Sequence, residues 1–230
     1  MKDIFLVDVD DTVLDFHGVS ALALRVAFEE NGIEWKEELE TSFRVFNGEL
    51  WAALERKELA RDTLMKERFP RFFAHMGMKD VDGGRVNESF IRYISTHPRF
   101  IKGAEDFLKE LEKMGSVYFV TNGTKEIQKS RFDIIQLWKY AKQTFVSQEV
   151  GYDKPAKEYT DYITAHIPGF DCARAVWIGD SLSADVRAAK DAGITSIWYN
   201  PMQKTLGEGI SPDYVASDFS EILSILKKIS

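Results

Sequence analysis

Short apolar runs that alternate with stretches of helical periodicity dominate the chain outside residues 16–98. The clearest runs lie at 4–7, 117–120, 175–178 and 196–199, and weaker ones lie at 144–146 and 213–215. Strands this short and this apolar are typical of a parallel sheet that helices cover on both faces. We therefore expect an α/β fold with a Rossmann-like parallel sheet as its core.

The predicted helices of this part end at residues that favour helix termini. One helix ends before Gly115, and a second, over residues 184–192, ends before Gly193. Ser220 is expected to cap a final helix. The apolar positions of that helix are Ile222, Leu223, Leu226 and Ile229.

Residues 16–98 do not show this alternation of strands and helices, because no strand pattern interrupts their helical periodicity. Their apolar side chains recur every three or four positions, for example at Leu39, Phe43, Phe46, Leu50 and Leu54. Gly77 and residues 82–84 predict loops between the helices, and Pro98 closes the stretch. We expect residues 16–98 to form an inserted all-helical cap domain, and residues 1–15 with 99–230 to form the α/β core.

The composition narrows the class of partner. The chain has 230 residues, 44% apolar and 29% charged, with a net charge of −7 and a pI near 5.3. This balance argues against a nucleic-acid polymer or a membrane surface as partner, because both usually need a basic face. The single cysteine, Cys172, excludes an intramolecular disulfide and zinc sites built on several cysteines. No apolar run has the length of a signal peptide or a membrane span, so we expect a cytoplasmic protein.

Two acidic residues follow the first predicted strand directly. Residues two apart in a strand face the same way, so Asp8 and Asp10 can point into one site at the edge where open α/β sheets bind ligands. Carboxylates brought together repel, which raises a pKa or recruits a cation. The pair could supply a nucleophile, a general acid or metal ligands, although taken alone it more often marks a solvated acidic turn.

Candidate residues also follow three other predicted strands. Thr121 and Asn122 offer a hydroxyl and an amide after one strand, and Lys154 comes after the next. Asp180 follows a later strand, with Asp185 five residues beyond it. An acid at this place can complete an all-oxygen site for Mg²⁺, although Asp180 alone would equally be a helix N-cap. Four such places in this order favour one functional site at the edge of the sheet.

With these motifs, the chain resembles the haloacid dehalogenase superfamily of hydrolases over essentially its whole length. The residues that carry the resemblance are Asp8, Asp10 and Thr12 of the first motif, Thr121 of the second, Lys154 of the third, and Gly179, Asp180 and Asp185 of the fourth. The helical insert is similar to the cap of the subfamily that contains phosphoglycolate phosphatase and β-phosphoglucomutase. The resemblance implies a phosphatase that depends on Mg²⁺.

The resemblance also implies a role for each motif residue. Asp8 would attack the phosphorus of a phosphate monoester and form an aspartyl-phosphate, while Asp10 would protonate the leaving alkoxide and then activate water. Mg²⁺ would be held by Asp8, by the main-chain carbonyl of Asp10 and by Asp180, with Asp185 supporting the metal site. The residues that would bind the phosphoryl group are Thr121, Asn122 and Lys154.

A further resemblance concerns the substrate. The stretches at 15–16, 46–51, 68–69 and 147–151 are similar to those of bacterial pyrimidine 5′-nucleotidases, which hydrolyse nucleoside monophosphates. The cap residues that would then select the substrate are Phe16, Asn47, Trp51 and Arg68. Phe16 and Trp51 would equally suit the packing of the cap itself.

The residues leave several alternatives open. A phosphorylated metabolite such as phosphoglycolate or a sugar phosphate is the main alternative substrate. A phosphoglucomutase-like phosphotransferase would need cap residues that protect the aspartyl-phosphate, and His17 is the one nearby histidine. A dehalogenase has no use for an acid at Asp10, and a non-catalytic regulatory protein would be expected to have lost a motif residue. We expect a small-molecule phosphate ester as partner, and a monomer or homodimer.

Overall fold

The computed structural model describes residues 1–206 and 209–229. Contacts divide the chain into two compact units, one of residues 1–15 with those from 98 onward, the other of residues 16–97. We call the first the α/β unit and the second the helical unit. The main-chain N–H of Asp15 donates to the carbonyl of Arg99 at 2.9 Å. The two connections to the helical unit therefore leave the α/β unit side by side.

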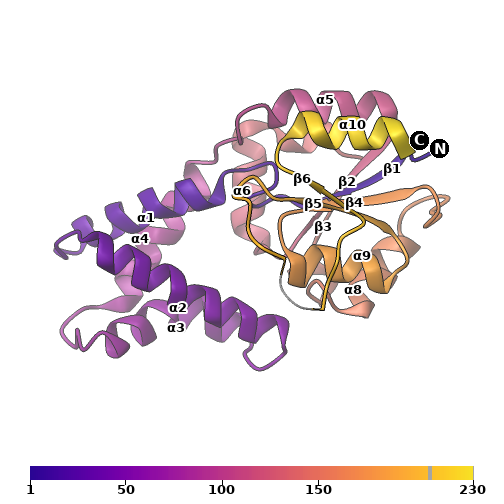
Figure 1. Ribbon diagram of the computed structural model, residues 1–230. Coiled ribbons are helices and arrows are strands. Elements are labelled where there is room, and N and C mark those ends of the chain that lie inside the picture. Colours follow the sequence, from indigo (N-terminus) through magenta and orange to yellow (C-terminus); the bar gives the residue numbers. More distant parts are fainter. Residues whose placement is uncertain (207–208, 230) are drawn as a thin grey trace. The chain divides into compact units, whose positions relative to one another are not determined.

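The α/β unit contains a six-stranded parallel sheet with the order β3-β2-β1-β4-β5-β6 (Figure 1). The strands are β1 (Ile4–Val7), β2 (Ser116–Thr121), β3 (Gln143–Val146), β4 (Ala175–Gly179), β5 (Thr195–Tyr199) and β6 (Tyr214–Ala216). Each predicted strand is present within one residue of its expected ends. The predicted α/β fold is confirmed.

Helices cover both faces of this sheet (Figure 1). Those on one face include α5 (Ala104–Met114) and α10 (Phe219–Ile229), and those on the other include α8 (Lys157–Ala165) and α9 (Arg187–Asp191). The further elements of this unit are α6 (Lys125–Ile135), η1 (Leu137–Tyr140), α7 (Ser147–Val150) and η2 (Leu182–Val186). The layers are therefore helix, sheet and helix.

The central strand β1 shows why the strand sequences are continuously apolar. Phe5 and Val7 join the apolar cluster that includes α5 and α10, whereas Ile4 and Leu6 join the cluster that includes α8 and α9. Successive side chains of a strand point to opposite faces, and here both faces are covered. Polar residues therefore enter only where the strand ends, at the edge of the sheet.

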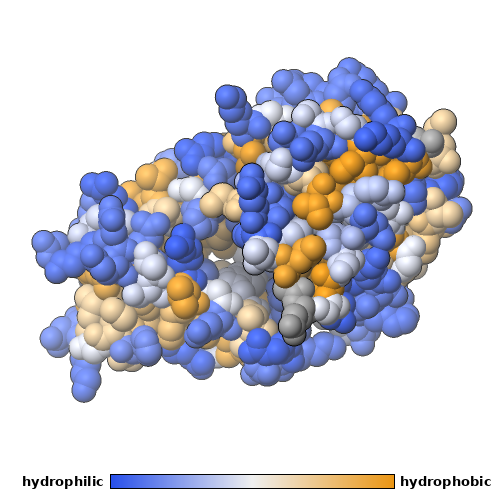
Figure 2. Space-filling model, viewed as in Figure 1, coloured by the Kyte–Doolittle hydropathy of each residue, from blue (hydrophilic) through white to orange (hydrophobic). Residues whose placement is uncertain are grey.

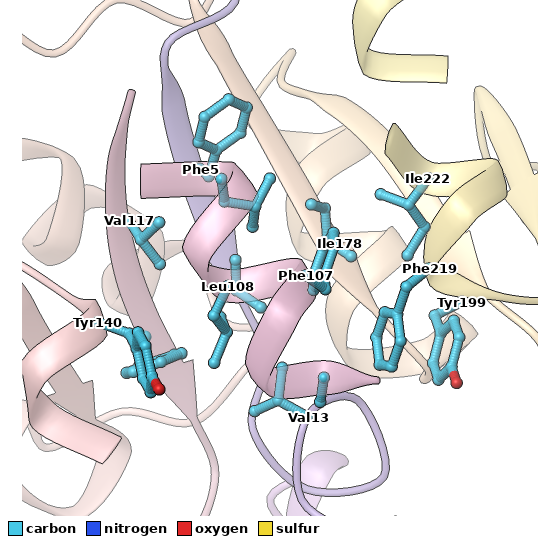
Figure 3. Packing of buried hydrophobic residues seen from close by; sticks show 14 of the residues in the cluster. Phe5, Val13, Phe107, Leu108, Val117, Tyr140, Ile178, Tyr199, Phe219 and Ile222 are labelled. Carbon is cyan, nitrogen blue, oxygen red and sulfur yellow. The ribbon is translucent and has the colours of Figure 1, made fainter. Parts of the chain in front are cut away.

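Stacked aromatic rings tie the first helical layer to the sheet (Figure 3). The ring of Phe219 on α10 stacks on that of Phe107 on α5, with the centroids 4.7 Å apart. The other stacking partner of Phe219 is Tyr199 of β5, at 5.0 Å. Such pairs add about 0.5–1.5 kcal/mol beyond the area that they bury. They fix the C-terminal helix against the sheet.

The helical unit consists of α1 (Phe16–Glu30), α2 (Glu37–Glu55), α3 (Arg61–His75) and α4 (Gly83–Thr96). Its core is aromatic. The ring of Phe43 on α2 stacks on Phe69 of α3 with the centroids 4.4 Å apart, and Phe90 of α4 lies 5.3 Å from Phe69. These contacts give the insert a hydrophobic core of its own.

Two local predictions are wrong. Ser220 does not cap the last helix, because the carboxylate of Asp218 accepts the main-chain N–H of Glu221 at 2.9 Å. Residues 83 and 84 lie in the first turn of α4 rather than in a loop. A Cβ at Gly83 would lie 2.5 Å from the main-chain nitrogen of Pro70, so this glycine lets α4 begin against α3.

Hydrophilic side chains cover most of the face shown in Figure 2, with apolar side chains in small groups between them. The exposed apolar side chains include Trp138, Met202 and Val215. Cys172 is exposed and forms no disulfide, as expected for a lone cysteine. Among the described residues, no helix has the length and apolar character needed to span a bilayer.

Gly115 tests the close contact between the end of α5 and the start of β1. A Cβ there would lie 2.2 Å from the carbonyl oxygen of Asp3, so one segment must move when the side chain is added. We expect Gly115→Ala to lower the free energy of unfolding by about 1–3 kcal/mol, measured by urea denaturation. Gly48→Ala is the control, because open space surrounds Gly48 on α2 and alanine favours a helix by about 0.5–1 kcal/mol. Equal stability of Gly115→Ala and the parent would contradict the contact.

Candidate active site

Three neighbouring strands bring the sequence motifs together. Asp8 follows β1 directly, Thr121 ends β2, and Asp180 follows β4. Since β1 lies between β2 and β4 in a parallel sheet, these three carboxyl ends meet at one edge. The strand order reverses direction beside β1, which is where open α/β sheets bind their ligands.

A buried ion-pair cluster lies at this edge. The ammonium Nζ of Lys154 donates to Oδ1 of Asp8 at 2.5 Å and to Oδ1 of Asp185 at 2.7 Å. Its third donor bonds to the carbonyl of Val120 at 3.0 Å. The side chains of Lys154 and Asp185 are 2% exposed and that of Asp8 is 8% exposed. All three N–H donors of Lys154 are therefore used to hold the site itself.

The charges of this cluster depend on one another. Burial raises the pKa of Asp8 to about 7, with the repulsion of Asp185 adding to the effect and the attraction of Lys154 opposing it. Burial by itself would lower the pKa of Lys154, but the carboxylates of Asp185 and Asp8 outweigh it and raise that pKa above its usual value. The lysine therefore stays charged and favours the ionised form of Asp8.

Two local turns aim Asp8 and Asp185 into the site. Thr12 lies on the tight turn after β1, and its hydroxyl donates to Oδ2 of Asp8 at 3.0 Å. Asp185 lies on η2, a wide helical turn after β4, where Nε1 of Trp177 donates to its Oδ1 at 3.1 Å. A Cβ at Gly179 would lie 2.4 Å from Oδ2 of Asp185. Glycine at this position makes room for the carboxylate.

Asp8, Asp180 and Asp185 form a group of acids that could hold a metal ion. One carboxylate oxygen from each lies within 4.8 Å of the others. Burial raises the pKa of Asp180 well above its usual value, and the charges of Asp8 and Asp185 add to this. A divalent cation would relieve this repulsion, and an all-oxygen set of donors suits Mg²⁺. The residues present therefore fit such an ion.

Thr121 is arranged to donate a hydrogen bond. Its Oγ1 accepts one bond from Nε2 of Gln128 at 2.8 Å and a second from the main-chain N–H of Gly123 at 3.0 Å. A hydroxyl group can accept two hydrogen bonds and donate one. Both acceptor positions of Thr121 are filled, so its O–H remains as a donor. This hydroxyl can donate to an anionic oxygen at the edge of the sheet.

Asn122 supports Lys154. Its amide Nδ2 donates to the carbonyl of Lys154 at 2.9 Å, and its Oδ1 accepts the N–H of Lys154 at 2.8 Å. This pair of bonds fixes the main chain that carries the buried ammonium. Asn122, which is predicted to bind a phosphoryl group, therefore helps to position Lys154.

Two residues that belong to none of the sequence motifs contact Asp10. Gln128 and Arg131 lie on α6, and their side chains bond to the two carboxylate oxygens of Asp10 at 2.8 Å and 2.6 Å. Both residues are buried, although their surroundings in the sequence read as a polar surface helix. Their spacing of three residues, which places them on one helix face, was the available signal.

The residues predicted to select the substrate lie in the helical unit. Phe16 begins α1, while Asn47 and Trp51 share one face of α2, and all three are half-buried. The guanidinium of Arg61 lies over the ring of Trp51, 5.7 Å from the ring centroid. Each of these three side chains keeps some exposure to solvent, although Oδ1 of Asn47 is itself buried.

Arg68 lies in the core of the helical unit, unlike these three. It is 2% exposed, its Nε donates to Oδ1 of Asn87 at 2.9 Å, and its guanidinium lies 4.8 Å from the ring of Phe90. Burial lowers the pKa of Arg68 to about 10. These contacts, with Asn87 and with the ring of Phe90, indicate a packing role inside the unit.

Comparison with known proteins identifies the family. Residues 2–193 match the haloacid dehalogenase-like hydrolases. The chain belongs to this family. It is 34% identical over 221 residues to the HAD-hydrolase YfnB of Bacillus subtilis, a match that covers 96% of this chain and 94% of that protein. The crystal structure of YfnB bound to magnesium has a TM-score of 0.91 to this hydrolase and covers 98% of both chains.

Two further relatives of this haloacid dehalogenase-like hydrolase carry a substrate in their names. Pyrimidine 5′-nucleotidase PynA of Streptococcus pneumoniae is 32% identical over 224 residues, covering 97% of this chain and 94% of that protein. Pyrimidine 5′-nucleotidase YjjG of Escherichia coli is 25% identical over 221 residues, covering 96% of each. The expected enzyme class, a phosphatase of the haloacid dehalogenase superfamily, is confirmed.

Lys154 tests the charge balance of the site. We expect Lys154→Met to lower the free energy of unfolding by about 3–5 kcal/mol, because it leaves two buried carboxylates without their cation. Urea denaturation measures the change. The control is Lys157→Met, since the side chain of Lys157 is 80% exposed and its surface ion pair with Asp161 is worth about 0–1 kcal/mol. Similar stabilities of the two variants would mean that Lys154 does not neutralise the cluster.

Proposed function

We propose that this hydrolase cleaves phosphate monoesters with the help of Mg²⁺ through an aspartyl-phosphate on Asp8, and that its substrates are pyrimidine nucleoside 5′-monophosphates. The observation that carries the proposal is the buried Asp8 carboxylate, held at a strand end by Lys154 and grouped with two further acids that could hold a metal. The names of the relatives PynA and YjjG support the choice of substrate.

Asp8 suits the part of the nucleophile. Lys154 and Thr12 hold its two carboxylate oxygens, so the group approaches phosphorus in a fixed orientation. A phosphate monoester is a dianion that repels a carboxylate, and the charge of Lys154 lowers this repulsion at the point of attack. Attack by an Asp8 oxygen forms the O–P bond of the aspartyl-phosphate and breaks the bond from phosphorus to the leaving oxygen.

The phosphoryl group would be bound by donors that the edge of the sheet provides. Thr121 has its hydroxyl proton left to donate, as the two acceptor positions of its oxygen are filled. Lys154 acts through its charge, while Asn122 acts through Lys154, whose main chain it holds. Asp10 would protonate the leaving alkoxide and then take a proton from the water that cleaves the aspartyl-phosphate, which restores Asp8.

Asp8, Asp180 and the main-chain carbonyl of Asp10 would hold Mg²⁺, with Asp185 supporting the site. When bound, Mg²⁺ supplies positive charge that stabilises the oxygens of the transferring phosphoryl group. The structure of YfnB bound to magnesium, at 34% identity, supports this choice of metal.

The helical unit would act as the cap that reads the leaving group. Phe16, Asn47 and Trp51 are the residues for this role, because an aromatic face can stack on a nucleobase and an amide can pair with a base edge. Arg68 is not part of this proposal, since its guanidinium bonds to Asn87 and lies against Phe90 inside the unit. Phosphoglycolate, in contrast, has no ring that could stack on these aromatic side chains.

Metal removal and the Asp8→Asn variant test the metal requirement and the aspartyl-phosphate. We expect EDTA to abolish the release of phosphate and added Mg²⁺ to restore it. Asp8→Asn should remain at background even with Mg²⁺, because it keeps the shape of the side chain and loses the nucleophile. A colorimetric phosphate assay measures both. Full activity in EDTA would contradict the metal requirement, and an active Asp8→Asn variant would contradict the aspartyl-phosphate.

A substrate panel tests the choice of leaving group. We expect a higher kcat/KM for pyrimidine nucleoside monophosphates than for phosphoglycolate or hexose phosphates. Loss of a stacking ring in Phe16→Ala should cost nucleotides about 1–3 kcal/mol, roughly 5- to 150-fold in kcat/KM, and cost a small aliphatic phosphate ester less. Leu22→Ala, at an exposed position of the same helix, is the control. A clear preference for phosphoglycolate or a hexose phosphate would overturn the nucleotidase proposal and leave the phosphatase class intact.

A further inference from the structure

Two side chains of α6 hold the carboxylate of Asp10 from both sides. Nε2 of Gln128 donates to its Oδ2 at 2.8 Å, and Nη1 of Arg131 donates to its Oδ1 at 2.6 Å. Arg131 also donates to Oε1 of Gln128 at 2.8 Å. The three side chains therefore form a closed hydrogen-bonded set, in which each oxygen of Asp10 keeps a second lone pair for a proton.

Burying the side chains of Arg131 and Gln128 costs free energy, and their contacts with Asp10 give a reason for that cost. The side chain of Arg131 is 2% exposed and Gln128 is 1% exposed, whereas Lys129 on the same helix is 72% exposed. A guanidinium taken out of water needs a charged partner, and apolar side chains would anchor the helix at lower cost. The polar pair adds what an apolar anchor lacks, which is a fixed orientation for the Asp10 carboxylate.

Gln128 also connects Asp10 to the residue proposed to bind phosphate. The same Nε2 that bonds to Asp10 lies 2.8 Å from Oγ1 of Thr121. Gly123 makes this possible, because a Cβ there would lie 2.4 Å from Nε2 of Gln128. The amide fills one acceptor position of the Thr121 hydroxyl and so directs its proton outward.

We propose that Arg131 and Gln128 are positioning residues for the hydrolysis. Arg131 orients Asp10 for proton transfer to the leaving oxygen, and Gln128 orients both Asp10 and the Thr121 hydroxyl. The inference rests on the proposed function, in which Asp10 is the general acid and base.

Leaving-group dependence separates this role from a structural one. p-Nitrophenolate leaves without a proton, whereas an alkoxide needs one from the general acid. The kinetic constant to compare is kcat/KM, because it ends with the departure of the leaving group and excludes hydrolysis of the aspartyl-phosphate. We expect Arg131→Met to lower kcat/KM about 10²-fold for the best alkyl phosphate of the substrate panel, the scale of a misplaced catalytic group, and far less for p-nitrophenyl phosphate. Lys129→Met is the matched control and should change neither.

Asp10→Asn serves as the reference. It should show the same selective loss as Arg131→Met, and the double variant should lose no more than Asp10→Asn alone, because Arg131 acts through Asp10. Arg131→Lys, which keeps the charge, should recover part of the alkyl rate, and thermal unfolding shows that each variant is folded. Equal losses on both substrates in Arg131→Met, beside a selective loss in Asp10→Asn, would overturn the inference alone. Equal losses in Asp10→Asn would overturn the acid role of Asp10 and the inference with it.

Inhibition by inorganic phosphate distinguishes the two positioning residues. Gln128→Met should raise the inhibition constant of phosphate, since it leaves the Thr121 hydroxyl without its fixed orientation, and should also show the selective loss on the alkyl phosphate. Arg131→Met should raise the phosphate inhibition constant less than Gln128→Met does, because Arg131 reaches Thr121 only through Oε1 of Gln128. An unchanged constant in a folded Gln128→Met variant would overturn the role of Gln128 at Thr121.

Discussion

The ammonium of Lys154 between Asp8 and Asp185 is the interaction on which the site depends. A parallel sheet brings the ends of β1 and β4 together, and these ends carry acids that repel one another once buried. A buried cation with every donor used makes this grouping stable. Asn122, which follows β2, then fixes the main chain of Lys154 through two hydrogen bonds. The position of the ammonium therefore also depends on the end of β2. The same balance of charges favours the ionised form of Asp8 and holds its carboxylate at the edge of the sheet.

Close packing gives the site its second constraint. Gly123 and Gly179 lie where a Cβ would overlap the side chains of Gln128 and Asp185. The two glycines therefore make room for the side chains around the reacting groups. The main-chain N–H of Gly123 also bonds to Thr121 and thereby directs the Thr121 hydroxyl. The site is thus built by steric fit as much as by charge.

Under the proposed function, the reacting groups and the residues that select the substrate lie in different units. The α/β unit contains every motif residue, and the helical unit has an aromatic core of its own. A fold can carry several functions when the reacting groups lie on one part and the groups that read the substrate lie on another. In this hydrolase, the half-buried aromatic residues of the helical unit are where substrate choice would be expected to change, while the edge of the sheet would keep its chemistry.

The sequence by itself determined the sheet, the strand ends that carry Asp8, Thr121 and Asp180, and the candidate Lys154 in the segment after β3. Both faces of the sheet are covered, so the central strands β1 and β4 are continuously apolar, and the first polar residue after each marks the edge. Tertiary structure decided which side chains meet there. Gln128 and Arg131 read as part of a polar surface helix until α6 packs against the edge, and Arg68 reads as a ligand-binding cation until the helical core encloses it. The apolar pattern locates the strands, but only the packed chain determines which polar side chains are buried and which polar groups they contact.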